Sequence, residues 1–276
     1  MERYESLKIT NRFMFAKVFS HEDVAKDFLQ AILKINIEKI SVVAEATKEE
    51  DPFRKGVRLD IIASDDPPGA PPRYFDIEMQ MIDTGELGKR ARYYQSMCDL
   101  DALNKGEGYE DLGEQYIIFL CPEDIFGAGK AIYEFQNQEA TDPRITMKDL
   151  CYKKFYIFKK YKKIKDKLVR EYMQYFATQE YKSEKMKRIH DLVNKYRKDP
   201  FTKKAFMTLE QELNIRYKKG IDIGVAKGID IGVAKGIAQG VDSRNRELAK
   251  AFRDAGVPLE IISKQTDLPP EEIKAL

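Results

Sequence analysis

Two strand-like runs on either side of a proline-rich turn constrain the fold of this chain more than any other feature. The runs are GVRLDIIAS at residues 56–64 and RYFDIEMQM at residues 73–81, with DDPPGAPP between them. Apolar and polar residues alternate in both runs, which is the pattern of β-strands. Proline ends a strand because it cannot donate a ladder hydrogen bond. The sequence therefore predicts a β-hairpin here.

The polar face of this hairpin is unusually acidic. If the hairpin is symmetric about its turn, Asp60 lies opposite Glu78 and Arg58 lies opposite Gln80, with Asp76 on the same face. Directly opposed Cβ atoms are roughly 4.5–5.5 Å apart, so the two carboxylates repel unless positive charge lies between them. A divalent cation such as Mg²⁺, which prefers oxygen ligands, would supply it. Alternatively, Arg58 neutralises a solvated acidic face, and the residues alone leave both interpretations open.

Further helix and strand patterns complete one domain. Helical spacing of apolar residues from Val24 to Ile35 predicts one helix, and residues 85–103 predict another that ends at the breaker NKGEG. Additional strands are predicted at residues 39–46, 114–122 and 131–137. The order of helix, strand meander, helix and strand predicts an α/β or α+β domain that ends near residue 158.

The charge of the chain is unevenly distributed around a net value of +2. Residues 151–220 carry 21 Lys and Arg against 8 Asp and Glu, whereas the rest of the chain carries 27 against 38. This asymmetry suits a protein in which one part attracts phosphates and another holds cations. A lysine-rich, solvated helical surface would explain the same counts.

A glycine-containing repeat follows the basic region. KGIDIGVA at residues 219–226 recurs unchanged at 227–234, and glycine stands at every fourth position from Gly220 to Gly240. This spacing keeps the glycines near one helical face, as in close helix–helix contacts. Each glycine, however, costs a helix roughly 0.8–1 kcal/mol relative to alanine. The repeat is therefore either a helix that docks on a partner surface or a flexible tether.

The chain is expected to have four segments. They are an α/β domain at 1–158, a basic helical region at 159–218, the glycine repeat at 219–241 and a small helical tail at 242–276. The tail has a helix-turn-helix-like pattern. A small dimerisation or docking element is an equally good interpretation of it.

Composition argues against several classes of protein and site. No apolar run approaches the roughly 20 residues that a membrane helix needs, and MERYESLKITNRF lacks the apolar core of a signal peptide. Three widely spaced cysteines suit a reducing compartment, so a cytoplasmic protein is expected. Only two histidines are present, which disfavours a histidine-rich metal site or a catalytic triad.

The acidic strand pair and the segments after it resemble the PD-(D/E)xK nuclease superfamily, in its transposase and recombination-promoting nuclease branch. The motifs are GVRLDIIASDD and RYFDIEMQM, followed by LGKRARYYQSMCDLDALNKGEGYEDLGEQYIIFLCPEDIFG. The resemblance runs from about Leu7 to AIYEFQN at 131–137, and continues weakly into the repeat and tail. It implies a restriction-endonuclease-like α/β core, a mixed central sheet flanked by helices, with an all-helical C-terminal extension.

The resemblance also implies roles for individual residues. Asp60 and Glu78 would be metal ligands, and Gln80 would hold the third catalytic position, where the superfamily usually has lysine and this branch commonly has glutamine. Lysine offers positive charge to the reacting groups, whereas glutamine offers only hydrogen bonds. Candidates to supply that charge and to contact DNA phosphates are Arg58, Arg90 and Arg92.

Two further questions concern helical residues. In this superfamily an acidic residue of the N-terminal helix often completes the site, and Asp23 and Asp27 are equal candidates. Tyr93 and Tyr94 follow the arginines, and core packing is the favoured interpretation for both.

The leading functional hypothesis is a Mg²⁺-dependent DNA endonuclease acting in recombination or transposition, with Mn²⁺ as a possible substitute. Its basic region would bind the DNA backbone with little sequence specificity. The alternative is a catalytically inactive DNA-binding or assembly protein that retains the nuclease fold, and Gln80 is its best support. A homo-oligomer formed through the glycine repeat and tail is compatible with either.

Overall fold

The computed structural model describes residues 3–48 and 57–276. The chain divides into two compact units, Met1–Phe206 and Met207–Leu276, and each is described by itself. Among the described helices, none combines the length and the apolar character needed to cross a bilayer.

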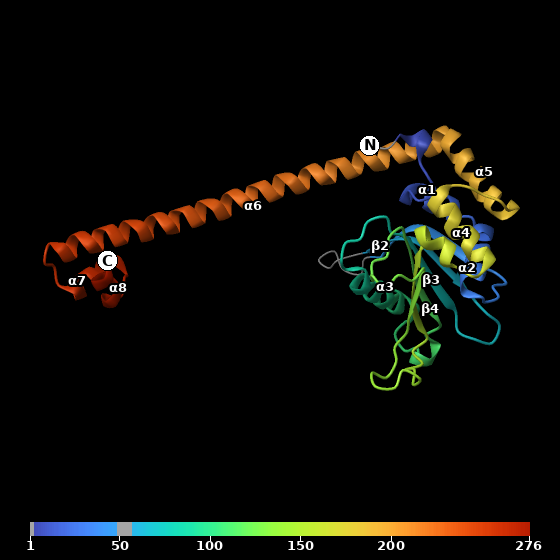
Figure 1. The fold of residues 1–276 in the computed structure, drawn as a ribbon, viewed down its shortest axis with the longest axis horizontal. Coiled ribbons are helices and arrows are strands. Elements are labelled where there is room, and N and C mark those ends of the chain that lie inside the picture. Colours follow the sequence, from blue (N-terminus) through green and yellow to red (C-terminus); the bar gives the residue numbers. More distant parts are fainter. Residues whose placement is uncertain (1–2, 49–56) are drawn as a thin grey trace. The chain divides into compact units, whose positions relative to one another are not determined.

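A six-stranded mixed sheet forms the centre of the first unit (Figure 1). Its spatial order is β1-β2-β3-β4-β6-β5. The strands are β1 Ser41–Lys48, β2 Val57–Asp65, β3 Arg73–Met79, β4 Gln115–Cys121, β5 Ile132–Phe135 and β6 Cys151–Ile157. Strands β1 to β3 are antiparallel, β3, β4 and β6 are parallel, and β5 is antiparallel to β6. This is the mixed α/β fold that the resemblance implied.

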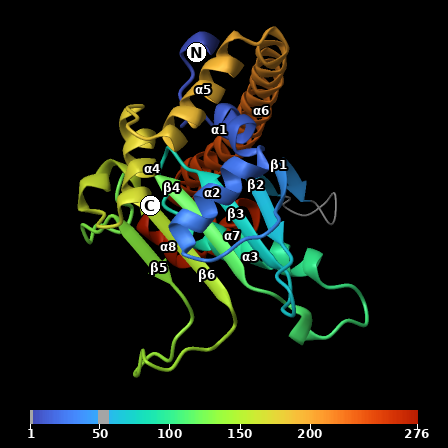
Figure 2. The ribbon, with the colours of Figure 1, turned by 90° about the vertical axis from the view of Figure 1, so that its right-hand side faces the viewer.

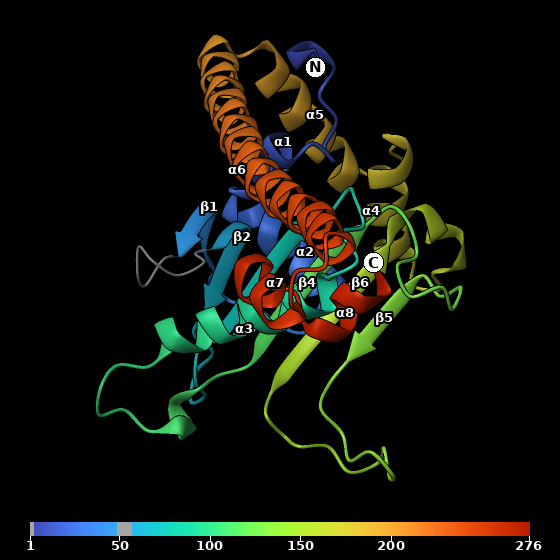
Figure 3. The ribbon, with the colours of Figure 1, turned by 90° about the vertical axis from the view of Figure 1, so that its left-hand side faces the viewer.

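Helices cover both faces of the sheet (Figures 2 and 3). On one face lie α1 Arg12–Phe19, α2 Glu22–Leu33 and α4 Lys167–Thr178, with α5 Glu184–Lys198 packed against α1 and α4. On the other face lies α3 Leu87–Ala102, whose Ala91, Tyr94 and Met97 pack with sheet residues such as Ile117 and Phe119. Short 3₁₀ segments lie at Tyr4–Ser6, Tyr109–Asp111 and Phe158–Lys163.

The hairpin of β2 and β3 has the predicted register. Ile61 pairs with Ile77 and Ile62 pairs with Asp76, as a hairpin symmetric about its turn requires. The expectation of a possible solvated acidic face is wrong, however, because Asp60 and Asp76 are each 1% exposed and Glu78 is 3% exposed. β4 and α3, which come later in the chain, cover what would otherwise be an outer surface.

Strand β6 is a finding that the sequence patterns did not predict. Its sequence, CYKKFYI, places Lys153 and Lys154 in the middle of the strand and so interrupts the apolar alternation. The Lys154 ammonium pairs at 2.8 Å with Glu134 of β5, and Lys153 donates to Gln95 Oε1 of α3 at 2.6 Å. These contacts satisfy the charges, so the strand can lie between β4 and β5.

The second unit contains most of α6 Pro200–Asp254, together with α7 Leu259–Thr266 and α8 Pro270–Ala275. The glycine repeat is helical throughout and lies within α6. α6 ends two residues before Gly256, whose positive φ of 78° suits the turn into α7. The two short helices pack with the end of α6 around a small apolar core: Ala249, Ile262, Leu268 and Ile273.

Candidate active site

The candidate site lies where β2 and β3 separate. Their pairing ends at Ile61 and Ile77, and beyond this point each strand contributes a carboxylate in place of a ladder hydrogen bond. The Asp60 amide donates to Glu78 Oε1 at 2.8 Å, and the Met79 amide donates to Asp60 Oδ2 at 3.0 Å. One oxygen of each carboxylate is therefore bound to the main chain of the other strand.

The second oxygen of each carboxylate faces an arginine. Arg12 Nε of α1 donates to Asp60 Oδ1, and Arg90 Nη2 of α3 lies 3.4 Å from Glu78 Oε2. Two negative and two positive side chains thus meet at the fork of the two strands. The two arginines come from opposite faces of the sheet.

Arg90 is held by several groups at once. Its Nη1 donates to Gln80 Oε1 at 2.7 Å, and its Nη2 and Nε donate to the Tyr94 hydroxyl at 2.7 and 3.1 Å. The guanidinium also lies over the rings of Tyr94 and Phe119, at 5.2 and 5.7 Å from their centroids. Tyr94 is packed in the core, as expected, but its hydroxyl in addition positions Arg90, whereas Tyr93 is exposed.

Gln80 is fixed at both ends of its side-chain amide. Its oxygen accepts from Arg90, and its nitrogen donates to the Ile82 carbonyl. Gln80 itself brings no charge, but its partner Arg90 places a guanidinium next to Glu78. Arg90 of α3 is thus a positively charged side chain that the structure brings to both Gln80 and Glu78.

The electrostatics of the pair follow from its burial. Desolvation, and next the nearby Asp60, raise the pKa of Glu78 to about 8, although Arg12 and Arg90 act in the opposite direction. Burial lowers the pKa of the Arg12 guanidinium, but the attraction of Asp60 and Glu78 outweighs it and the pKa rises above its ordinary value. Arg12 therefore stays charged and is attracted by both carboxylates.

Comparison with protein families identifies the relatives of this chain. A model described as PD-(D/E)XK nuclease family transposase matches residues 10–219, a span that includes Arg12, Asp60, Glu78, Gln80 and Arg90. The chain belongs to this family. Comparisons with curated proteins and with solved structures gave no match.

The donor set of the fork fits a divalent cation. Asp60 and Glu78 offer carboxylate oxygens, the ligands that hard cations prefer. Both side chains are almost fully buried, and the fork already concentrates cationic groups on Oδ1 and Oε2. The residues that face these two oxygens show that the site attracts positive charge.

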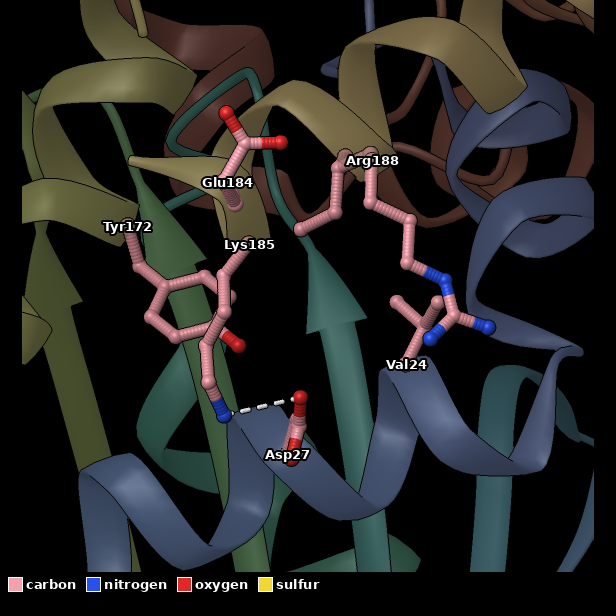
Figure 4. Close-up of a pocket in the computed structure, with 7 residues that line it drawn as sticks. Val24, Asp27, Tyr172, Glu184, Lys185 and Arg188 are labelled. Carbon is pink, nitrogen blue, oxygen red and sulfur yellow. Dashed lines mark ion pairs between the residues drawn. The ribbon is translucent and has the colours of Figure 1, made fainter. Parts of the chain in front are cut away.

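Asp23 and Asp27 of α2 bind residues of α5 in the structure. Asp27 pairs with Lys185 of α5 at 2.8 Å, and Asp23 pairs with Arg188. Figure 4 shows Asp27 and Lys185 in a pocket of about 230 Å³ between α2, α4 and α5. Within residues 3–48 and 57–276, no cluster of three or more His, Cys, Asp and Glu side chains is arranged to hold a metal. In the structure Asp23 and Asp27 thus pair with α5, and a role for either as a third ligand stays a prediction.

The other predicted arginines lie in different surroundings. Arg92 is exposed on another face of α3 from Arg90. Arg58 belongs to β2, opposite Thr47, but its side chain is outside the described part of the structure. Of the three arginines proposed for phosphate contact, Arg90 is the one that the described side chains bring to the carboxylates.

Arg12 is the site residue that sequence reasoning missed. It is the first residue of α1, where Asn11 caps the helix by accepting from the Phe13 and Met14 amides. The remaining residues of α1 are almost all buried, with sequence FMFAKVF. An arginine beside such an apolar run was the available signal, because a charge on a core-facing helix needs a partner.

The basic region and the acidic remainder of the chain are joined by ion pairs. At least six cationic side chains of residues 151–220 bind acidic residues outside that range: Lys154–Glu134, Lys159–Glu123, Lys160–Asp124, Lys185–Asp27, Arg188–Asp23 and Lys203–Glu5. Part of the charge asymmetry along the sequence is therefore balanced within the first unit. The lysines that remain exposed are the ones available to phosphates.

Proposed function

We propose that this chain is a Mg²⁺-dependent DNA endonuclease that hydrolyses phosphodiester bonds in recombination or transposition. The observation that carries the proposal is the buried pair of Asp60 and Glu78 at the fork of β2 and β3, with one oxygen of each turned away from the main chain. Family membership supports nuclease chemistry at this position.

The residues of the fork would have different roles in the reaction. Asp60 Oδ1 and Glu78 Oε2 would hold the cation, for which Mn²⁺ is a chemical substitute. When bound, the cation lowers the pKa of a water molecule and neutralises charge that develops on the phosphate. Arg90 adds a fixed guanidinium beside Glu78, and Gln80 and Tyr94 keep it oriented. Such preorganised charge stabilises a transition state without reorganisation during the reaction.

DNA is the proposed substrate, bound through its phosphates. Exposed lysines and arginines between residues 153 and 219, together with Arg58 and Arg92, are proposed to contact the backbone. Binding of this kind weakens steeply with salt and carries little sequence information.

A catalytically inactive DNA-binding protein is the second candidate. The specific observation in its favour is that Gln80 is engaged on both sides, by Arg90 and by the Ile82 carbonyl, so its amide is committed to structure. This candidate predicts DNA binding that does not respond to Mg²⁺ or to substitution of the carboxylates.

Self-association through α6 is proposed as a separate property. From Ile221 to Val241 this helix carries a run of isoleucines and valines that are 46–64% exposed. Exposed apolar residues gathered in one segment are typical of interaction surfaces. A second copy of this chain is the proposed partner, and a chain truncated at Tyr217 should lose self-association.

Cleavage of supercoiled plasmid tests the nuclease proposal. Wild type with Mg²⁺ should nick the plasmid, whereas Glu78→Gln and Asp60→Asn should not, while both still retard DNA in a binding assay. Glu180→Gln, which alters an exposed carboxylate, is the matched control and should cleave like wild type. If plasmid cleavage is the same in all four proteins, the nuclease proposal fails and the inactive DNA-binding protein becomes the supported candidate.

A further inference from the structure

Arg12 occupies a cation's place at the Asp60 side of the fork. Asp60 Oδ2 accepts from the Met79 amide, and Asp60 Oδ1 accepts from Arg12 Nε. The oxygen that would bind a divalent cation is thus already bound by a guanidinium of this chain. Arg12 comes from α1, a helix that lies on the face of the sheet opposite α3 (Figure 2).

The two guanidinium groups already bring positive charge to the fork. With both carboxyl groups ionised, as metal ligation requires, Asp60 and Glu78 contribute two negative charges, which Arg12 and Arg90 balance. A divalent cation added beside both guanidinium groups would leave excess positive charge around two carboxylates that are almost fully buried. Like charges at such short range in a low dielectric repel strongly, so one guanidinium has to leave when the cation binds.

The surroundings of the two arginines decide which one leaves. Arg90 is 23% exposed, donates to Gln80 and twice to Tyr94, and lies over two aromatic rings. Arg12 is 47% exposed, so its side chain reaches the solvent edge of the site. Because more of Arg12 already faces water, its guanidinium is the one that can turn into solvent, whereas Arg90 is held by Gln80, Tyr94 and two aromatic rings.

We propose that Arg12 is a resident cation of the site, and that a divalent cation binds by displacing its guanidinium from Asp60. Arg12 thereby sets the concentration of cation at which the site fills. This proposal rests on the proposed metal site and goes beyond it, since it assigns Arg12 a role that opposes metal binding. Arg12 acts on metal binding through its contact with Asp60 and takes no part in bond breaking.

Binding of Mn²⁺ measures this role without reference to cleavage. We would titrate the full chain with Mn²⁺ and follow the free ion by electron paramagnetic resonance, comparing wild type with Arg12→Gln. Removal of a charged hydrogen-bond partner from Asp60 should tighten Mn²⁺ binding roughly tenfold or more. Arg144→Gln, which removes a guanidinium from the exposed Asp142 pair, should bind Mn²⁺ as wild type does.

The further variants separate the possible outcomes. Asp60→Asn should abolish the binding, which assigns it to the fork. Arg12→Lys keeps the charge without the planar guanidinium and should give an intermediate Mn²⁺ affinity. It replaces Arg12→Gln in the comparison if that variant does not fold. Detectable Mn²⁺ binding by Arg12→Gln together with none by wild type would also support the proposal, because it would mean that Arg12 keeps the site closed to the cation.

Two results would overturn it. Equal or weaker Mn²⁺ binding by Arg12→Gln and Arg12→Lys, with binding still abolished in Asp60→Asn, would refute the role of Arg12 and leave the metal site intact. Absence of Asp60-dependent binding in every protein would remove the metal site and this proposal together.

Discussion

Asp60 and Glu78 each accept a hydrogen bond from the main chain of the other's strand, at 3.0 Å from the Met79 amide and 2.8 Å from the Asp60 amide. These reciprocal bonds replace the ladder where β2 and β3 separate. The two carboxylates are therefore structural parts of the fork as well as candidate ligands. Substitutions that keep shape and hydrogen bonding are needed to separate the two roles.

The pH dependence of stability should reveal the raised pKa of Glu78. Burial and the neighbouring Asp60 raise that pKa to about 8, so the folded chain binds a proton more tightly than the unfolded chain. The carboxyl then contributes stability at low pH that is lost as the pH rises towards 8. In metal-free buffer, Glu78→Gln should lack this loss, and from pH 5 to pH 8 its free energy of unfolding should gain on that of wild type by on the order of 3 kcal/mol. Urea unfolding at several pH values measures the difference, and parallel profiles would contradict it.

Arg90 should matter more to cleavage than its neighbour on the same helix. Arg90 links Glu78, Gln80 and Tyr94, so Arg90→Ala removes the fixed positive charge of the site. We expect plasmid cleavage to fall by on the order of 100-fold, the scale seen when one preorganised donor is lost. Arg92→Ala should weaken DNA binding without a comparable fall in the rate at saturating DNA. Single-turnover rates decide the point, and equal falls for the two variants would argue against a special role for Arg90.

The residues of the fork show what the sequence could and could not predict. A hairpin symmetric about its turn, which the structure shows for β2 and β3, is enough to predict that Asp60 and Glu78 lie across from each other. Their burial does not follow from this symmetry, because the covering elements α3 and β4 begin only at Leu87 and Gln115, well after Asp60, and they cover the pair only once the chain has turned back. A local alternation pattern describes one strand pair and carries no information on what later covers it.

Arg12 and β6 were missed for related physical reasons. Arg12 is 48 residues from its partner Asp60, and no spacing rule joins an arginine at a helix start to a distant strand. In β6 the central lysines hide the strand pattern, because their partners Gln95 and Glu134 belong to other elements. In both cases a charged side chain is placed by a tertiary contact.

The acidic residues of α2 should be dispensable for metal binding. Asp27 binds Lys185 and Asp23 binds Arg188, and all four side chains are about half exposed. We expect Asp23→Asn and Asp27→Asn to keep wild-type Mn²⁺ affinity and to lose less than about 1 kcal/mol of stability, the usual worth of an exposed pair. Calorimetric titration of both variants beside Asp60→Asn tests this. A loss of affinity in either variant would restore that residue as a third ligand.

Glycines of α6 should be needed for self-association and not for folding. A Cβ built on Gly228 or Gly232 meets no atom within 4 Å, so nothing described in this chain requires glycine at either position. Alanine at both should stabilise the helix by roughly 0.8–1 kcal/mol per site. If a second copy packs closely there, the double variant Gly228→Ala, Gly232→Ala should nevertheless shift the molar mass from light scattering towards the monomer. Gln239→Ala, which raises helix propensity without touching a glycine, should leave the mass unchanged. A stabilised double variant with wild-type mass would show that the glycines serve no contact between copies.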